Sequence, residues 1–485
     1  MTMTPLLFSL LTVQTLLGAF DNFWHHELHA RLPQRISARR ELQLHAAREA
    51  IYGVLFAAFA WLSFQGLWAV LIAALLVGEA FITLADFLEE DRSRRLPPFE
   101  RALHTILTVS YGLLLGLLAP GLWSAAQQTS SLALAYHGLW SWFFSLSSLG
   151  VLMWSVRNIL AVRHLARLAE TTEDAPATVP QAIGRSTVLV TGGTGFVGSA
   201  LVGQLVREGR RVIVLSRDPV QARALLGRSV WVVEQLDDIP AETRIDAIVN
   251  LAGAGILGAP WTKARRRVLV QSRLRVLDSV QRLIERLEHR PEVLVAASAV
   301  GYYGLRSGNT VLTEIAAADP GRFQSDLCVA IETAARRAEA LGTRVACLRP
   351  GIVLGHDGGA YPLQALAARL GLGAILGTGS QPMPWIHLDD VTGLIRHAIS
   401  EPALHGPFNA VAPERVTQAA FTRALAASFG RRAFLHMPAW PLRRLLGEMS
   451  ELLLDGQNVA PLHAQASGYR YTHATLEGAL ASLAR

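Results

Sequence analysis

A strand, a glycine-rich loop and a helix follow one another at residues 187–206, and no other feature constrains the fold of this chain as strongly. Thr187–Thr191 is an apolar, β-branched run of the kind found in buried parallel strands. The loop after it reads Gly192, Gly193, Thr194, Gly195, Phe196, Val197 and Gly198. Glycines at this spacing allow a tight turn, a close approach of the backbone to a pyrophosphate, and close packing of helix on strand. The sequence therefore predicts a dinucleotide-binding Rossmann domain.

The second predicted strand, 211–215, bears on the choice of cofactor. It ends at Ser216, Arg217 and Asp218, about 20 residues past the glycine loop. An acidic residue at this place binds the ribose hydroxyls of NAD, whereas a nearby arginine accommodates the 2′-phosphate of NADP. Arg217 therefore favours NADP(H), and Asp218 keeps NAD open as the alternative.

Two further predicted strands, at about 229–234 and 246–250, continue the alternation of strands and helices. Such alternation predicts an α/β fold with a doubly wound parallel sheet. The fourth strand runs into Leu251, Ala252 and Gly253, where small residues let a cofactor lie against the strand end. We expect the dinucleotide to be bound by these three residues and by Gly192, Thr194, Gly195, Phe196, Val197, Gly198 and Arg217.

The first third of the chain has a different composition. Hydrophobic residues make up 51% of the 485 residues and charged residues only 17%, and the apolar excess lies before about residue 165. A helix that spans a bilayer needs about 20 mostly apolar residues. Five candidates occur, at about 5–20, at 50–88 divided in two by the polar break 63–66, at 102–122 and at 137–156. We predict an all-α membrane domain of about five helices over residues 1–167.

The arginines of this domain alternate from loop to loop. They follow the first, third and fifth candidate spans, whereas the loops 63–66 and 123–136 contain no charged residue. Cytoplasmic loops are enriched in Lys and Arg. The pattern predicts a protein integral to the cytoplasmic (inner) membrane, with its N-terminus outside, its Rossmann domain in the cytoplasm, and membrane lipid as a partner.

Ionisable residues lie within or beside the candidate spans, mostly toward their cytoplasmic ends. They are Asp21, His25, His26, His29, His45, Glu49, Glu79, Asp86 and His104. Carboxylates and histidines on facing helices can build a metal or redox site. The alternative is interfacial anchoring and hydrogen bonding between helices, which we favour on the sequence alone, so that no metal ligand is predicted.

The sequence also indicates where the domains begin and end. Residues 168–186 are acidic and rich in Pro and Ala, which predicts a linker; a Rossmann domain over 187–400 and a small C-terminal domain over 401–485 follow.

The net charge of +7 comes from residues that cluster beside apolar segments, so no nucleic-acid partner is expected. Cys328 and Cys347 lack the spacing of metal ligands and are expected to be buried thiols.

Six motifs in the C-terminal part resemble those of the extended short-chain dehydrogenase/reductase superfamily, of the NAD-dependent epimerase/dehydratase type. They are VLVTGGTGFVGSALVGQL, IVNLAGAGI, AASAVGYYG, LRPGIVLG, WIHLDDV and FNAVAPE. The chain is similar, more narrowly, to epimerase-family proteins of undefined substrate that end in a small domain of their own. The resemblance covers about 187–485 and implies a small C-terminal α/β substrate region. The membrane half resembles an N-terminal domain sometimes fused to such proteins, which implies no function.

The resemblance also implies a site. Ser298 stands where the family has its catalytic Ser or Thr, and Tyr302 and Tyr303 match the Tyr-Gly that follows. The family's Tyr-x-x-x-Lys, which supplies an acid/base phenol and a lysine, is absent. Gln324 and Cys328 occupy those positions. Lys263, the only lysine, lies well upstream.

Two roles for the tyrosines remain open. Tyr302 or Tyr303 donates a proton in a carbonyl reduction, aided by Arg273, Arg306 or His387, or both tyrosines simply pack against the sheet edge and the nicotinamide. The resemblance places Pro350 at the nicotinamide end of the cofactor. It places Trp385 and His387 at the substrate, where Arg273 in the arginine-rich helix after Trp261 is expected to attract an anionic group.

These features together predict a membrane-anchored NADP(H)-dependent oxidoreductase or epimerase. Its substrate is expected to be small or lipid-linked, and its active site is atypical because the Tyr-x-x-x-Lys motif is missing. The alternative is a protein that binds dinucleotide without turnover and reports redox state to the membrane domain, as a sensor or scaffold.

Overall fold

A computed structural model describes residues 3–30, 32–93, 96, 98–173, 186–257, 261–305 and 310–484. The chain divides into two compact units, residues 1–175 and 176–485, which are described separately. Most of the predicted linker, residues 174–185, lies outside the described residues, as do Arg306 and part of its loop.

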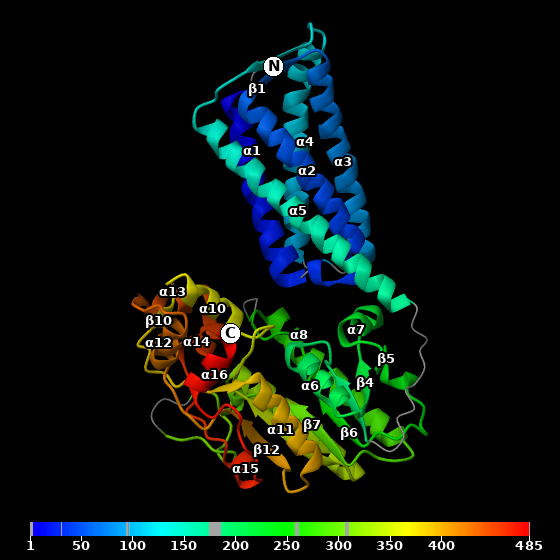
Figure 1. Ribbon diagram of the computed structural model, residues 1–485, viewed down its shortest axis with the longest axis vertical. Coiled ribbons are helices and arrows are strands. Elements are labelled where there is room, and N and C mark those ends of the chain that lie inside the picture. Colours follow the sequence, from blue (N-terminus) through cyan, green and yellow to red (C-terminus); the bar gives the residue numbers. More distant parts are fainter. Residues whose placement is uncertain are drawn as a thin grey trace. The chain divides into compact units, whose positions relative to one another are not determined.

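Five long helices form the N-terminal unit (Figure 1). They are α1 (Pro5–Asp21), α2 (Arg39–Trp61), α3 (Leu67–Ser93), α4 (Pro98–Ala126) and α5 (Leu139–Glu173). A π-helix, η1 (Asn22–Ala30), continues α1, and two short 3-10 turns, η2 (Leu32–Gln34) and η3 (Ile36–Ala38), lead into α2. This arrangement confirms the predicted all-α domain of about five helices.

Four segments of this unit are long and apolar enough to cross a membrane. They are Pro5–Glu27, Leu67–Arg92, Phe99–Ala126 and Leu139–Arg167. The predicted second span falls in the C-terminal half of α2, whose N-terminal half carries Arg39, Arg40, Glu41, Arg48 and Glu49. Helix α2 is therefore too polar to be counted among the candidate spans, although it packs within the same bundle.

The two uncharged loops of the N-terminal unit meet. Strand β1 (Leu62–Gln65), between α2 and α3, pairs antiparallel with β2 (Ser131–Leu134), between α4 and α5. Both loops therefore lie at the same end of the bundle, as the alternation of charged and uncharged loops requires.

A seven-stranded parallel sheet forms the centre of the C-terminal unit, in the order β12-β8-β7-β6-β3-β4-β5. Its strands are β3 (Thr187–Thr191), β4 (Arg211–Leu215), β5 (Val230–Val233), β6 (Ala247–Asn250), β7 (Val293–Ala297), β8 (Arg344–Pro350) and β12 (Gly406–Ala410). From β5 to β8 the order is 3-2-1-4-5-6 along the chain, which is that of dinucleotide-binding sheets. The predicted boundary at residue 400 falls just before the last strand of the sheet.

Helices cover both faces of this sheet. Its helices and turns up to β8 are α6 (Phe196–Arg207), α7 (Pro219–Leu226), η4 (Leu236–Asp238), α8 (Lys263–Arg286), η5 (Val300–Tyr303), α9 (Phe323–Arg336) and η6 (Arg337–Leu341). Val188 and Val190 face α6 and α11 (Leu388–Ser400) in one core, and Leu189 faces α8 and α9 in another. Because alternate residues of each strand are buried on opposite faces, the predicted doubly wound fold is confirmed.

The remaining elements form a smaller region beside the sheet (Figure 1). Two parallel strand pairs belong to it, β9 (Ile352–Leu354) with β11 (Trp385–His387), and β10 (Ala374–Leu376) with β13 (Leu435–Met437). Its helices and turns are α10 (Tyr361–Arg369), α12 (Gln418–Ser428), α13 (Ala439–Leu446), η7 (Gly447–Ser450), α14 (Glu451–Leu454), α15 (Leu462–Ala466) and α16 (Leu476–Leu483).

Candidate functional site

The glycine loop joins β3 to α6 in a turn that side chains would block. Gly192 has φ +71°, and a Cβ there would lie 2.8 Å from the carbonyl carbon of Leu251. A Cβ on Gly198 would overlap the carbonyl oxygen of Gly192. Gly195 is the N-cap residue of α6, so the first N–H groups of this helix open at the turn. An anion is favoured there by the unpaired N–H groups and by the helix dipole.

The loop lies at the point where the order of the strands across the sheet reverses. Strand β3 is flanked by β4 on one side and by β6 on the other, and Thr191 at its end hydrogen-bonds to Asn250 at the end of β6. Leu251 and Ala252 continue from β6 beside Gly192. Ligands of open α/β sheets bind outside the carboxyl ends of the strands at such a switch point.

The other predicted residues of the loop divide into an exposed tip and a packed base. Thr194 and Gly195 are exposed, whereas Phe196 packs against Gly355 and Gly358, at each of which a Cβ would lie 2.7 Å from the aromatic side chain. The approach to the backbone of the loop is therefore left open while its base is fixed.

Arg217, just after β4, places a cation near the glycine loop's end of the sheet. Arg217 is exposed, whereas the carboxylate of Asp218 accepts a hydrogen bond of 2.9 Å from the backbone N–H of Gln221 and caps α7. The capping role engages one oxygen of Asp218 within the protein. Of the two residues that made the cofactor ambiguous, Arg217 is the one available to a 2′-phosphate.

Ser298 lies directly after β7, with α9 against it. The Ser298 hydroxyl and the Nε2 of Gln324 are both buried; the hydroxyl faces the thiol of Cys328, and Nε2 has no hydrogen-bond partner among the residues that the structure describes. A Cβ on Gly301 would lie 3.4 Å from Oε1 of Gln324 and 3.8 Å from Sγ of Cys328. Gln324 and Cys328 thus both lie beside Gly301, and Ser298 lies beside Cys328.

Neither replacement restores the missing acid/base pair. Burial raises the pKa of the Cys328 thiol to about 11, although Ser298 beside it favours the charged form. The thiol is therefore neutral at physiological pH and does not supply the positive charge that a lysine would. Two arginines act electrostatically on it, Arg349 of β8 and Arg273 of α8. The guanidinium of Arg273 packs over Gly253 and donates to the carbonyl of Ala254 at 3.0 Å.

Tyr302 and Tyr303 surround a buried arginine. Arg349 of β8 forms a bidentate ion pair with Glu332 of α9, with both N–O distances 2.8 Å, and lies 3.5 Å from the centre of the Tyr302 ring. The Tyr303 hydroxyl accepts from Arg349 at 2.9 Å and donates to Asn409 at 2.7 Å. Burial raises the pKa of Tyr303. Tyr303 is thus engaged inside the protein, whereas Tyr302 is only half-buried.

The predicted substrate residues of the WIHLDD motif, Trp385 and His387, are both buried, and the indole N–H of Trp385 has no hydrogen-bond partner among the described residues. Trp385 is buried in the core of the smaller region. His387 is the N-cap of α11, where its Nδ1 accepts from the N–H of Asp389 at 3.1 Å. The centre of its ring lies 3.8 Å from that of His473, with the two ring planes tilted by 42°. Asp390 accepts from the N–H groups of Thr472 and His473 at 2.7 and 2.8 Å, a role that the sequence does not reveal. Pro350 ends β8 and is half-buried.

The helix cap formed by His387 makes the stability of the folded C-terminal unit depend on pH. Burial, with the nearby His473, lowers the pKa of His387 to about 4, and its capping nitrogen must be unprotonated to accept a hydrogen bond. The unfolded chain, with a pKa near 6.5, binds this proton more readily, so stability is lost as the pH falls from about 6.5 through 4. We expect the Tm to fall less over this range in His387→Asn, which keeps a capping side chain that does not titrate. Equal slopes in the two proteins would contradict this role.

Comparisons with known proteins match the C-terminal unit. A family model described as "NAD dependent epimerase/dehydratase family" matches residues 188–411, and one described as "Domain of unknown function (DUF1731)" matches residues 437–483. "Epimerase family protein YfhF" of Bacillus subtilis is 37% identical over 300 residues, which cover 61% of this chain and 97% of that protein. "Epimerase family protein SDR39U1" of Homo sapiens is 36% identical over 299 residues, covering 60% and 98%.

Solved structures give the same result. The crystal structure of human epimerase family protein SDR39U1 with NADPH is 35% identical, with a TM-score of 0.56, and covers 61% of this chain and 99% of that one. A nucleoside-diphosphate sugar epimerase from Corynebacterium glutamicum is 25% identical, with a TM-score of 0.50, and covers 74% and 69%. The cofactor of the human structure is the one that Arg217 favours in the sequence.

Proposed function

This chain belongs to the NAD dependent epimerase/dehydratase family, and from that premise we propose that it is a membrane-anchored, NADP(H)-dependent oxidoreductase or epimerase acting on a small or lipid-linked substrate. The observation that carries the proposal is the meeting of two features at one edge of the sheet. The glycine loop follows β3 and Ser298 follows β7, and only β6 separates these strands. A dinucleotide bound across the loop extends toward Ser298 and the residues around it.

The choice of NADP(H) rests on Arg217 and Asp218. The arginine is exposed at the end of β4, and the aspartate caps α7. The human relative, whose structure contains NADPH, supports the same choice.

Arg217→Ala is therefore expected to weaken NADPH binding about tenfold, because a charge-assisted hydrogen bond to phosphate contributes roughly 1.5–3 kcal/mol. The affinity for NADH, which lacks the 2′-phosphate, should stay within about twofold. Isothermal titration with both nucleotides makes this comparison. An equal loss for NADH would remove Arg217 from the phosphate site.

The chemistry proposed for the site is the reduction of a carbonyl or its reverse. Bound NADPH supplies a hydride to the carbonyl carbon, and the oxygen takes up one proton, which gives an alcohol. The Ser298 hydroxyl and the Gln324 amide are proposed to donate hydrogen bonds to that oxygen, because both are buried, Nε2 of Gln324 has no partner among the described residues, and a thiol, which is a weak acceptor, is the neighbour of the hydroxyl. Tyr302 is the proposed proton donor, since Tyr303 is engaged by Arg349 and Asn409. Arg273 is proposed to hold an anionic group of the substrate.

Membrane anchoring is proposed from the N-terminal unit. Four of its segments are long and apolar enough to span a bilayer, and its two uncharged loops pair at one end. The arginine-rich connections are proposed to lie on the cytoplasmic side, which would place the Rossmann unit there as well. A lipid-linked substrate could then be bound without leaving the membrane surface.

The experiment that tests the proposal is NADPH oxidation by the full-length protein in lipid nanodiscs, with a panel of carbonyl compounds, nucleoside-diphosphate sugars and native lipid extract. We expect Ser298→Ala to lower kcat/KM by about 10² to 10⁴, the usual contribution of a positioned acid–base or hydrogen-bonding group. Ser298→Thr, which keeps the hydroxyl, should retain most of the activity. The control Ser279→Ala removes an exposed hydroxyl of α8 and should change nothing.

A sensor or scaffold is the second candidate, and one observation favours it. Gln324 and Cys328 stand in place of the family's acid/base pair, and neither supplies a proton relay at neutral pH. The sensor function is favoured over the enzyme if NADPH binds tightly but no component of the extract oxidises it, and if Ser298→Ala binds NADPH equally well.

A further inference from the structure

The N-terminal unit buries a cluster of histidines and carboxylates inside its bundle. Its members come from the end of α1 and from η1, α2, α3 and α4, and each is less than one-tenth exposed. They are Asp21, His25, His26, Glu41, His45, Asp86, Glu90, Glu100 and His104. Glu41 and Glu100 each precede a histidine by four residues, as Asp86 precedes Glu90, so each pair lies on one helical face.

Two groups within the cluster have the spacing of metal ligands. One ligand atom from each of His26, Glu90, Glu100 and His104 lies within 4.8 Å of the others, and the same holds for Glu41, His45 and Glu90. Ligand atoms bound about 2.0–2.2 Å from one ion are at most about 4.4 Å apart, so the groups need little contraction to coordinate. Glu90 is the residue that the two groups share. Within the first group its Oε2 lies 3.2 Å from His104 and its Oε1 lies 3.9 Å from His26.

The carboxylates buried in this interior require positive charge close to them. Seven buried carboxylates lie among the described residues of the unit: Asp21, Glu41, Glu49, Glu79, Asp86, Glu90 and Glu100. The guanidinium of Arg48 lies among them, 3.3 Å from Glu79 and 2.7 Å from Asp86. Ionised carboxylates are costly in an apolar interior unless opposite charge or metal compensates them. Arg48 pairs with carboxylates on one side of the cluster. Glu90 and Glu100 lie beside the histidines on the other side.

We propose that this bundle binds two divalent transition-metal ions, with Glu90 as the bridging ligand. Mixed imidazole and carboxylate ligands suit iron, manganese or zinc. Helical bundles hold dinuclear centres with glutamates and histidines that project inward from several helices; Glu and His are three residues apart there and four apart here. His26, Glu100 and His104 bind one ion with Glu90, and Glu41 and His45 bind the other. The proposal is independent of any turnover by the Rossmann unit.

Outer contacts of the ligands support this assignment. Nδ1 of His104 faces Glu90, and its Nε2 lies 2.9 Å from Asp21, which also contacts His25 at 2.6 Å. Asp86 lies 3.0 Å from Nε2 of His45. A carboxylate behind a metal-bound histidine orients the ring and raises its basicity as a ligand.

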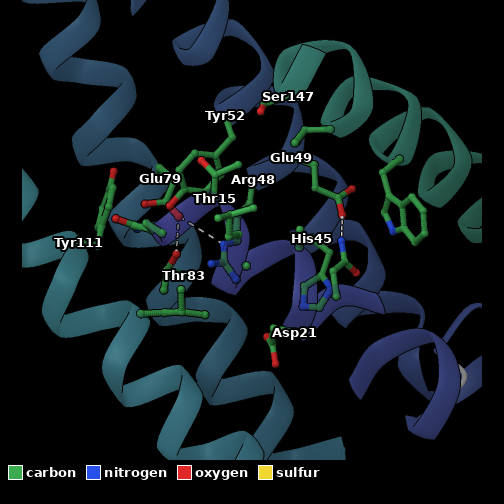
Figure 2. Close-up of a pocket in the computed structure, with 18 of the residues that line it drawn as sticks. Thr15, Asp21, His45, Arg48, Glu49, Tyr52, Glu79, Thr83, Tyr111 and Ser147 are labelled. Atoms are coloured by element: carbon green, nitrogen blue, oxygen red, sulfur yellow. Dashed lines mark hydrogen bonds and ion pairs between the residues drawn. The ribbon is translucent and has the colours of Figure 1, made fainter. Parts of the chain in front are cut away.

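A cavity of about 530 Å³ opens beside the cluster. Its polar wall includes Asp21, His26, His45, Glu90 and His104, and much of the remaining lining is apolar. Figure 2 shows Asp21 and His45 at this cavity together with Arg48, Glu79 and Tyr111. The volume lies in the range of small-molecule sites, so metal ions here would be reachable by an apolar ligand.

Metal analysis of the full-length protein tests the proposal. The protein is purified without a His-tag, incubated with Fe²⁺, Mn²⁺ or Zn²⁺ in turn, desalted and measured by inductively coupled plasma mass spectrometry. We expect about two ions per chain with at least one of the metals, the stoichiometry of a two-metal site. Fewer than about 0.2 ions per folded chain with all three would overturn the proposal in favour of a protonated histidine–carboxylate network.

Variants locate the ions within the cluster. Glu90→Gln is expected to lose both ions, and His104→Gln about one, because only Glu90 belongs to both groups. The matched control is Glu49→Gln, a buried carboxylate of α2 that accepts hydrogen bonds from Asn22 and Asn158 at 2.8 and 3.0 Å, outside both groups. It should retain two ions. Monodispersity and thermal unfolding show that each variant is folded, and full metal content in folded Glu90→Gln would contradict the bridging role.

Discussion

Gly198→Ala is expected to reduce the affinity for NADPH at least about a hundredfold, which corresponds to about 2.7 kcal/mol of binding free energy. The new methyl group would overlap the carbonyl oxygen of Gly192, so that the turn and the first residues of α6 must move apart. The N–H groups that bind the pyrophosphate would then lose their common direction. Fluorescence titration of bound NADPH measures the loss.

The matched control lies one turn further along the same helix. Gly203→Ala adds a methyl group whose nearest neighbour is the flexible end of Arg207, at 3.5 Å, so its NADPH affinity should stay within about twofold. If Gly198→Ala is folded and binds NADPH as tightly as the control, the glycine loop does not hold the pyrophosphate.

Arg349→Met is expected to destabilise the C-terminal unit by about 3–5 kcal/mol, because it leaves the carboxylate of Glu332 buried without its partner. Arg349 is 1% exposed and Glu332 5% exposed, and the Tyr303 hydroxyl loses a donor in the same variant. Urea unfolding followed by circular dichroism measures the change.

Two further variants separate charge burial from loss of packing. The double variant Arg349→Met with Glu332→Leu removes both charges and should recover most of the stability. Arg337→Ala breaks an exposed pair with Asp278 at 3.4 Å and should cost less than about 1 kcal/mol. If the single Arg349 variant is no less stable than Arg337→Ala, the buried network is not important for stability.

Local sequence patterns predicted much of the fold. The strand–glycine–helix order of residues 187–206 and the β-branched strands after it set the parallel sheet, because each strand and turn depends on neighbours in the sequence. Long apolar segments likewise predicted the helical N-terminal unit. Helix α2 differs because its polar half, with Glu41, His45 and Arg48, is accommodated by packing within the bundle rather than by solvent.

Contacts between distant residues were beyond such reasoning. Glu332 and Asn409 join Arg349 and Tyr303 from separate elements, so nothing in their sequence neighbourhoods indicates one network. His387 was expected to contact substrate, and its position as the N-cap of α11 was not predicted. Asp390 accepts hydrogen bonds from the backbone of Thr472 and His473, which lie 82 and 83 positions further along the chain. The grouping of His26 with Glu90 and Glu100 also depends on tertiary packing, although the Glu–His spacings on α2 and α4 were visible in the sequence.

Hydride transfer is the measurement that tests the proposed function most directly. Full-length protein in nanodiscs is incubated with NADPH that carries deuterium at both positions of nicotinamide C4 and with native metabolite and lipid extract, and the products are followed by mass spectrometry. The proposed enzyme predicts that deuterium appears on carbon in one product, and that Ser298→Ala slows the transfer by about 10² to 10⁴ while still binding NADPH. Tight NADPH binding with all of the deuterium retained on the nicotinamide would contradict it.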